Sequence, residues 1–362
     1  MEHRNPLLSE TSGEHRFITI GEIMLRLTPP NYEKIRMASS FEASYGGSEA
    51  NIALALANLG IDSTFFTVVP NNSLGKSAIR MLRSNDVHCT PCILSTPEQT
   101  PTHRLGSYYL ETGYGIRASK VTYDRKNSAF TEFNYDTVDL EALLKDFTWL
   151  HLSGITPALS TSCRKLMIDC LCIAKENGLI VSFDGNFRNT LWSWNEARDF
   201  CTQCLPYVDV LFGIEPYHLW VDDNDHSKGD KKDGVPFQPS YEQQDEIFHA
   251  FVERYPNIKC IARHVRYAHS GSENSLKAFM WYEGHTFESK LFRFNILDRV
   301  GGGDAFASGL IYAMMNNYKP MDMVNFAVAS SALKHTIRGD ANITDDAKSI
   351  RNLMNMNYDI KR

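Results

Sequence analysis

Compact apolar runs alternate with helical patterns along most of this chain, and this alternation constrains the fold more than any other feature. The runs occupy residues 148–154, 179–186, 208–213 and 258–264, and each ends in polar residues or glycine. Helical patterns lie between them, as in "STSCRKLMIDCLCIAKENG" (160–178). Strands that alternate with helices predict an α/β protein with a doubly wound, mainly parallel sheet flanked by helices. Ligands of such sheets bind beyond the carboxyl ends of the strands.

The N-terminal part follows a similar rhythm. Residues 16–30 are expected to form a first strand that ends at two prolines, and residues 63–70 a short second one. Residues 49–60 and 73–85 have the spacing of amphipathic helices, and Gly60 is a helix stop signal.

Two stretches that are rich in Tyr, Thr and Gly, residues 31–45 and 101–128, break this rhythm. They predict a small β lid of short antiparallel strands. A third stretch, 221–240, is charged, rich in Gly, Pro and Asp, and is expected to be a mobile surface loop. The expected organisation is a discontinuous α/β core of residues 16–30, 46–100 and 129–362, a lid of residues 31–45 and 101–128, and a flexible tail of residues 1–15.

Composition and charge exclude several classes of function. The chain has 362 residues, of which 43% are hydrophobic and 22% charged, as in ordinary globular proteins. A net charge of −6 without a Lys/Arg-rich stripe argues against nucleic acid as a partner. The polar N-terminus lacks the apolar region of a signal peptide, and no apolar run approaches membrane-spanning length. We therefore expect a cytoplasmic protein with no nucleic-acid or membrane partner. We also expect small-molecule partners and a homo-oligomer.

The chain has eight cysteines. Two pairs of them, Cys89/Cys92 and Cys201/Cys204, have the C-x-x-C spacing of zinc or redox sites. The two pairs lie more than a hundred residues apart, and neither lies in a knuckle-like turn. Cys201 and Cys204 would share one face of a helix, where thiols pack as small hydrophobic groups. We therefore expect the cysteines to pack rather than to bind metal.

The stretch "DRVGGGDAFASGL" (298–310) places Gly301, Gly302 and Gly303 directly before Asp304 and a helical pattern. One interpretation is a tight turn followed by an Asp that merely favours the helix start. The other is functional. The backbone N–H groups would hold a phosphoryl group in transfer, and the ionised Asp304 would accept a proton from an attacking hydroxyl. The stretch matches neither a P-loop nor a dinucleotide fingerprint.

Polar residues gather in three further segments, each of which is also compatible with a plain turn or surface. These are Gly46, Gly47 and Asn51 at the start of a helix, Asp184, Asn186 and Arg188 after a strand, and Tyr123 and Arg125 in the lid. If Arg125 and Arg188 converge on one crevice, their guanidinium groups would suit a carboxylate or a phosphate.

Together these segments resemble the ribokinase-like (PfkB) family of sugar kinases, in the right order from about residue 16 to 345. "YGGSEANIALALANLG" resembles the N-terminal signature of that family, and "DRVGGGDAFASGL" resembles its C-terminal signature, D-x-x-G-x-G-D. A finer resemblance, to 2-keto-3-deoxygluconate kinases, rests on "GEIMLRLTPP", the Glu of "GGSEAN", "HLSGITPAL", "FDGNFRNTLW" and "KHTIRGD".

The resemblance implies transfer of the γ-phosphoryl group of Mg-ATP to a hydroxyl of a sugar acid, giving 2-keto-3-deoxygluconate 6-phosphate. It also implies ATP and Mg²⁺, with a monovalent cation such as K⁺, as cofactors. A fructokinase or another ribokinase-like sugar kinase is the first alternative. A catalytically inactive sugar-binding regulator is the second.

Carried over by position, the resemblance implies Asp304 as the catalytic base and the amides of Gly301, Gly302 and Gly303 as an anion hole. The sugar acid would lie against Gly46, Gly47, Tyr108, Tyr123, Arg125, Ile155 and Arg188, with Asn51, Asp184 and Asn186 beside it. The nucleotide would lie along 269–275 and 325–335, at Ser270, Gly271, Ser272, Asn274, Gly303, Val328 and His335. Asp298 matches a position that helps to hold a monovalent cation in relatives.

The chain departs from the family at its N-x-x-E motif, which is tied to magnesium and phosphate handling. That motif falls on Ile214, Glu215, Pro216 and Tyr217, so neither its Asn nor its final Glu is present. Glu215 is the candidate to contact the ligands of the Mg²⁺ rather than the ion itself. The nucleotide loop also lacks the K-x-G-x-x-G pattern of many relatives.

Overall fold

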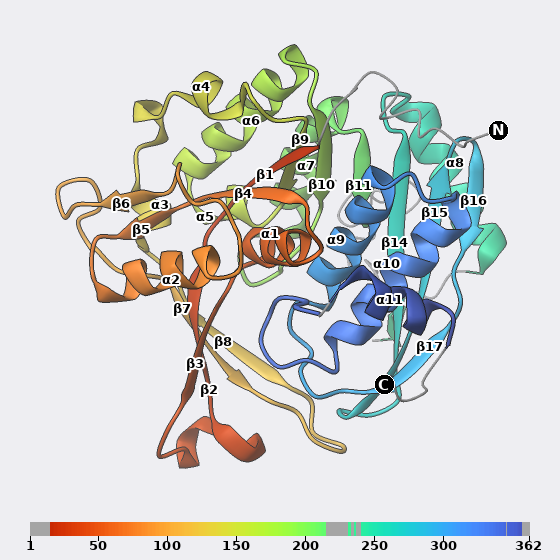
Figure 1. Ribbon diagram of the computed structural model, residues 1–362, viewed down its shortest axis with the longest axis horizontal. Coiled ribbons are helices and arrows are strands. Elements are labelled where there is room, and N and C mark those ends of the chain that lie inside the picture. Colours follow the sequence, from red (N-terminus) through yellow and green to blue (C-terminus); the bar gives the residue numbers. More distant parts are fainter. Residues whose placement is uncertain (1–14, 215–230, 233–234, 237–239, 345, 357–362) are drawn as a thin grey trace.

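The main sheet confirms the doubly wound, mainly parallel architecture (Figure 1). The computed structural model describes residues 15–214, 231–232, 235–236, 240–344 and 346–356. The strand order is β16-β15-β14-β11-β10-β9-β1-β4, and β17 also pairs with β15. Neighbours from β4 to β14 run parallel, and β15 pairs antiparallel with β14, β16 and β17. The strands are β1 (Arg16–Ile20), β4 (Asp62–Phe66), β9 (Trp149–Ser153), β10 (Ile180–Asp184), β11 (Val210–Phe212), β14 (Cys260–Ala268), β15 (Glu273–Tyr282), β16 (His285–Glu288) and β17 (Phe292–Asn295).

Helices cover both faces of this sheet, which explains why the central strands read as continuous apolar runs. One core cluster packs the sheet against α6, α7 and α8, and a second packs it against α1, α9, α10 and α11. The helices are α1 (Ser48–Asn58), α2 (Ser73–Arg83), α3 (Ala129–Glu132), α4 (Leu140–Leu144), α5 (Thr156–Leu159), α6 (Thr161–Glu176), α7 (Trp194–Cys204), α8 (Tyr241–Arg254), α9 (Gly302–Met315), α10 (Pro320–Lys334) and α11 (Ala347–Met354).

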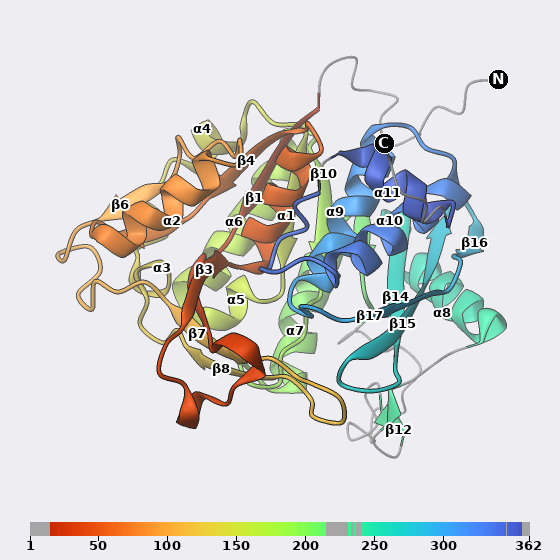
Figure 2. The same cartoon turned by 60° about the horizontal axis from the view of Figure 1, so that its bottom comes forward.

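A separate four-stranded sheet projects from the main body as the lid (Figure 2). Its order is β3-β2-β7-β8, with β2 (Met24–Thr28), β3 (Glu42–Gly46), β7 (Ser107–Glu111) and β8 (Lys120–Asp124). The expectation of a single strand over 16–30 is therefore wrong, because β1 belongs to the main sheet and β2 to the lid. β2 also runs parallel to β7, so the lid is mixed rather than wholly antiparallel.

The remaining strands form small pairs, β5 (Val68–Pro70) with β6 (Ile93–Ser95) and β12 (Lys231–Lys232) with β13 (Val235–Pro236). The tail expected over 1–15 lies outside the described residues except for His15, and most of the loop expected over 221–240 lies outside them as well. Cys201 and Cys204 are fully buried in the first core cluster, as their helical spacing predicts.

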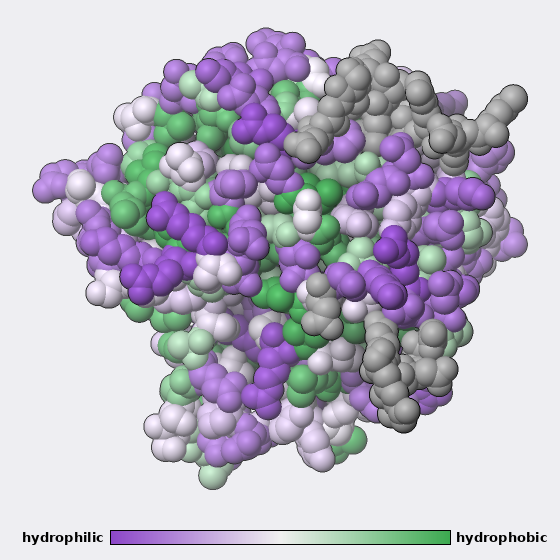
Figure 3. Space-filling model, in the orientation of Figure 1, coloured by the Kyte–Doolittle hydropathy of each residue, from purple (hydrophilic) through white to green (hydrophobic). Residues whose placement is uncertain are grey.

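Hydrophilic and hydrophobic side chains intermix on the face of the molecule that Figure 3 shows. Among the described residues, none of the helices combines the length and the apolar character that a membrane span requires. The lid carries the most exposed large apolar side chains of the described chain, Met37, Tyr114 and Ile116. The homo-oligomer expected from the sequence stays a prediction.

Candidate active site

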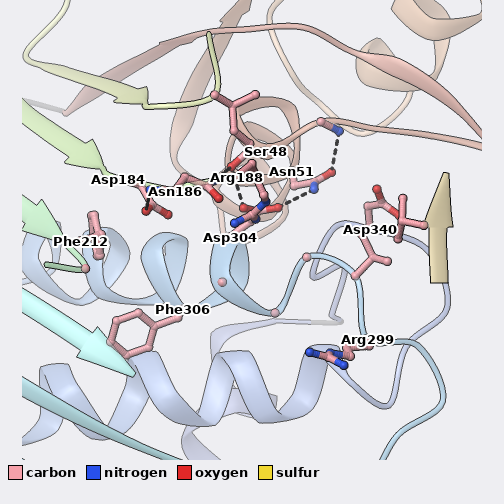
Figure 4. Close-up of a pocket in the computed structure, with 18 of the residues that line it drawn as sticks. Ser48, Asn51, Asp184, Asn186, Arg188, Phe212, Arg299, Asp304, Phe306 and Asp340 are labelled. Atoms are coloured by element: carbon pink, nitrogen blue, oxygen red, sulfur yellow. Dashed lines mark hydrogen bonds between the residues drawn. The ribbon is translucent and has the colours of Figure 1, made fainter. Parts of the chain in front are cut away.

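A cavity of about 730 Å³ opens where the carboxyl ends of the parallel strands face the lid (Figure 4). This is the place that doubly wound topology predicts for a ligand. The cavity brings together most of the predicted site residues, from seven separate segments of the chain. Those that line it are Gly47, Asn51, Tyr108, Tyr123, Arg125, Ile155, Asp184, Asn186, Arg188, Gly301, Gly302, Gly303, Asp304 and His335.

Asp304 lies in the first turn of α9, where two side chains from α1 orient its carboxylate (Figure 4). Ser48 Oγ donates a hydrogen bond to Oδ1 at 2.7 Å, and Asn51 Nδ2 donates one to Oδ2 at 2.6 Å. Asn186, beyond the end of β10, donates from Nδ2 to Ser48 Oγ at 2.9 Å. The carboxylate is thus fixed by residues that lie more than a hundred positions away in sequence.

The surroundings of Asp304 act on its pKa in opposite directions. Burial raises the pKa of Asp304, whereas the hydrogen bonds from Asn51 and Ser48 and the nearby charge of Arg188 lower it. The net effect is a raised pKa, which makes the carboxylate a better proton acceptor than an exposed Asp. Asn51 and Ser48 still favour the ionised form, the form that a general base needs.

The three consecutive glycines serve different purposes. Gly301 has φ of +80°, and a Cβ there would lie 1.7 Å from the carbonyl oxygen of Asp340, so only glycine fits. A Cβ on Gly302 would lie 2.5 Å from Cε1 of His335. At Gly303, the nearest atom would be Cε1 of His264 at 3.8 Å, an ordinary contact. Packing therefore explains the first two glycines, while Gly303 leaves bare backbone toward the cavity.

The two arginines that were expected to converge do line the same cavity. They differ in how their positive charges are compensated. Arg125 is buried and donates from Nε to Oε2 of Glu22 at 2.7 Å, and its Nη2 contacts the same oxygen. Ser128 Oγ donates to the other oxygen of Glu22. Arg188 is exposed, and within the described part of the chain it donates only to the carbonyl oxygen of Phe187 at 3.1 Å. Arg188 is therefore the guanidinium that is open to an anionic ligand.

At the other end of the cavity from Arg188, Arg299 lies before the glycine turn (Figure 4). Arg266 on β14 also lines the cavity, and both are half-buried cations close enough for their charges to interact. Among the described residues, neither has a hydrogen-bonded or ion-paired carboxylate. Burial and the charge of Arg299 lower the pKa of Arg266 to about 10, and burial lowers the pKa of Arg299. Two uncompensated arginines beside a glycine turn fit a polyanion such as a triphosphate.

Several predicted site residues lie elsewhere. Gly46 packs against Asp340, and Asp298 is buried behind the glycine turn. The β14–β15 turn, with Ser270, Gly271 and Ser272, contacts Gly115 of the lid instead of lining the cavity. Asn274 and Val328 are buried in the interior. Glu215, Pro216 and Tyr217 lie outside the described residues, and Ile214 is fully buried.

Residues that the sequence reasoning missed form the walls and supports of the site. Tyr108 donates its hydroxyl to Asp340, which also accepts from Arg26. Asp340 lies in "KHTIRGD" (334–340). The resemblance singled out this segment but gave no role to Asp340. Glu22, Ser48 and Arg299 lie inside motifs that the sequence analysis singled out, but they received no role there, and Arg266 lies outside those motifs. Their importance depends on tertiary contacts.

Comparison with known proteins agrees with this architecture. The family model described as "pfkB family carbohydrate kinase" matches residues 14–216. The 2-dehydro-3-deoxygalactonokinase of Haloferax volcanii is 31% identical over 330 residues, which cover 91% of this chain and 94% of the relative. The crystal structure of the 2-dehydro-3-deoxygluconokinase of Thermotoga maritima has a TM-score of 0.85 and 35% identity, covering 94% of this chain and 100% of that one.

A PfkB family carbohydrate kinase of Listeria grayi has a TM-score of 0.82 and 33% identity, with 94% and 99% of the two chains covered. These similarities extend over the main sheet and the lid alike, and they confirm the ribokinase-like fold that the resemblance implies. The chain belongs to the pfkB family of carbohydrate kinases.

Proposed function

We propose that this protein is an ATP-dependent kinase of sugar acids, and that 2-keto-3-deoxygluconate, converted to its 6-phosphate, is its substrate. The observation that carries the proposal is the position of Asp304. Its oriented, half-buried carboxylate follows directly after the bare backbone of Gly303, inside a cavity with cations at both ends.

The chemistry follows from this arrangement. The sugar hydroxyl forms a bond to the γ-phosphorus while the bond to the β-phosphate oxygen breaks, and ADP leaves. Asp304 accepts the hydroxyl proton, late in the reaction because the transition state is loose. The amides at the start of α9 and the positive end of its dipole stabilise the charge on the transferred group. The lid residues Tyr108 and Tyr123 cover the cavity, where water would otherwise compete as acceptor.

Arg266 and Arg299 would bind the ATP phosphates, since they are the cavity cations that lack a carboxylate partner among the described residues. In the described part of the chain, no group of three His, Cys, Asp or Glu side chains could hold a metal. The site therefore suits Mg²⁺ that arrives with ATP and is held by phosphates and water, as is usual for this ion. Bound in this way, Mg²⁺ supplies charge neutralisation on the phosphate oxygens.

Arg188 supports a sugar acid over a neutral sugar. A carboxylate could pair with its open guanidinium, whereas fructose offers no negative charge to bind. The names of the Haloferax and Thermotoga relatives, which both refer to dehydro-deoxy sugar acids, support the same class. The Asp184-x-Asn186-x-Arg188 element is also compatible with a fructokinase, so fructokinase remains the alternative.

A substrate panel tests the proposal. ADP release would be measured with ATP and 2-keto-3-deoxygluconate, its galactonate epimer, fructose or ribose, and the product identified by ³¹P NMR. We expect the highest kcat/KM with a keto-deoxy sugar acid and a phosphate monoester on its terminal carbon. Preference for fructose would favour the fructokinase alternative, and binding of sugar without ADP release would favour the inactive regulator.

A further inference from the structure

A lysine lies buried behind the glycine turn, and the phosphoryl transfer described above does not use it. Lys334, in the last turn of α10, is 0% exposed. Its Nζ donates to the carbonyl oxygen of Ile337 at 3.2 Å and to that of Asp298 at 3.5 Å. Lysines are almost never fully buried unless their charge is compensated. The ammonium therefore has a specific electrostatic environment.

That environment contains two carboxylates and one further cation. Arg26 of β2 donates from Nη2 to Oδ2 of Asp298 and from Nη1 to Oδ1 of Asp340, both at 2.5 Å. All three side chains are at most 5% exposed. Asp298, Asp340, Arg26 and Lys334 together carry no net charge, so the cluster is internally balanced.

This cluster does not fit the monovalent cation that the resemblance places at Asp298. Such an ion needs free oxygen ligands. Here Oδ2 of Asp298 accepts from Arg26 and from the amide of Gly339 at 3.0 Å, and Oδ1 accepts from the amide of Val300 at 3.2 Å. The carbonyl oxygen of Asp298 faces Lys334. An added ion would also be a third positive charge against two carboxylates, in a place that water does not screen.

We propose that Lys334, together with Arg26, is a built-in substitute for that monovalent cation and positions the glycine turn for phosphoryl transfer. The end of α10 contacts the turn at successive points. Lys334 contacts the carbonyl of Asp298, Ser331 Oγ donates to the carbonyl oxygen of Gly302 at 2.7 Å, and the ring of His335 packs against Gly302. Arg26 binds Asp340, whose carbonyl oxygen lies against Gly301.

The charge of Lys334 is fixed where it can also act on the anion hole. Burial is the largest influence on the pKa of Lys334 and lowers it. The negative charges of Asp298, Asp340 and Asp304 oppose this effect, the positive charge of Arg26 adds to it, and the net result is a lowered pKa. A buried positive charge acts over a longer range than one at the surface. Lys334 would therefore hold the backbone of the turn and favour a negative phosphoryl group in front of it.

The test begins with the wild-type enzyme and needs no variant. It rests on kinase activity but not on the identity of the sugar, so any accepted substrate serves. We expect kcat to agree within about twofold in KCl, NaCl and choline chloride of equal ionic strength. Loss of activity in choline chloride with recovery in KCl would overturn the proposal, whether or not any variant folds.

The second arm compares Lys334→Met with Lys319→Met, an exposed lysine at the other end of α10. We expect the Lys334 variant to lose kcat by roughly 100-fold, as for loss of an anion-hole element, with partial recovery in NH₄Cl or KCl. The Lys319 variant should remain at the wild-type rate. Wild-type kcat in Lys334→Met, without added K⁺, would contradict the proposal.

Thermal unfolding supplies a readout that does not depend on turnover. K⁺ should raise the Tm of Lys334→Met relative to choline at equal ionic strength, because the ion can then occupy the vacated carbonyl oxygens. The Tm of the wild-type protein should not respond selectively to K⁺. A selective K⁺ shift in the wild-type protein would mean that the ion binds beside Lys334, contrary to the proposal. If no sugar is phosphorylated at all, these Tm measurements still decide it.

Discussion

Asn51 Nδ2 donates a hydrogen bond of 2.6 Å to Oδ2 of Asp304, and so joins two helices whose bonded residues are 253 positions apart. The bond stabilises the ionised carboxylate and opposes the effect of burial on its pKa. It therefore links the fold of the N-terminal signature directly to Asp304, the proposed base, in the C-terminal one. Its loss should change the pH dependence of the reaction.

Asn51→Ala should shift the acid limb of the kcat–pH profile to higher pH. Hydrogen bonds to charged groups contribute about 1.5–3 kcal/mol, so the limb should rise by roughly 1–2 pH units. The sign follows because the bond favours the ionised form, and without it Asp304 is protonated at a higher pH. Asn58→Ala, on the same helix with a bond to Thr344, is the control and should leave the profile unchanged. An unshifted limb in Asn51→Ala would separate Asp304 from the titration.

The glycine turn allows stability and catalysis to be separated. Gly303→Ala meets no close atom and replaces glycine in a helix, so it should keep or raise stability, by up to about 1 kcal/mol. It should still lower kcat on the order of 100-fold if the phosphoryl group occupies that space. Gly301→Ala should instead be less stable, because φ is +80° and Asp340 blocks the Cβ. Urea unfolding and steady-state kinetics on both variants measure the two effects.

The arginines should differ in their effect on substrate preference. Arg188→Ala removes an open guanidinium, so KM for 2-keto-3-deoxygluconate should rise by roughly one to two orders of magnitude. KM for a neutral sugar should change much less. If KM rises equally for the sugar acid and for the neutral sugar, Arg188 does not bind the carboxylate.

Arg125→Ala should act mainly through Glu22. Leaving that buried carboxylate without its partner should cost about 3–5 kcal/mol of stability, and activity toward all sugars should fall alike. Adding Glu22→Gln to Arg125→Ala should recover part of the stability, measured by urea unfolding. A selective loss of sugar-acid binding at wild-type stability would show that Arg125 contacts substrate directly.

Arg299→Met and Arg266→Met should each raise KM for ATP by roughly tenfold or more, because each removes a charge from the proposed phosphate site. Arg293→Met is the matched control, since Arg293 is exposed and pairs with Glu273. KM for the sugar should change little in all three variants. Equal ATP KM in Arg299→Met and Arg293→Met would remove Arg299 from the nucleotide site.

Apolar runs and turn signals predicted the parallel strands of the main sheet, because these strands are buried on both faces. The antiparallel strands β15, β16 and β17 were not expected. The error at 16–30 has a physical cause. β1 and β2 are separated by only three residues, Gly21, Glu22 and Ile23, and no proline or charged run marks the passage from core to lid. Pairing with β3 and β7, rather than any local propensity, sends β2 into the second sheet.

The site was predictable where a motif puts its residues on one turn, as for Gly301 to Asp304. It was not predictable where function depends on pairing across the chain. Arg125 and Arg188 look equivalent in sequence, yet only Arg125 meets a buried Glu22. Asp298 reads as a cation ligand, yet Arg26, 272 positions away, already uses its carboxylate.

Turnover and binding of Asp304→Asn, measured side by side, test the central claim most directly. The substitution keeps the shape of the side chain and removes the proton acceptor, so kcat should fall by roughly 10²–10⁴-fold while calorimetric titration with ATP and the sugar acid gives nearly unchanged affinities. Because burial disfavours the charged carboxylate, the Tm at neutral pH should not fall. Wild-type turnover in Asp304→Asn, with both ligands still bound, would contradict the assignment of Asp304 as the base.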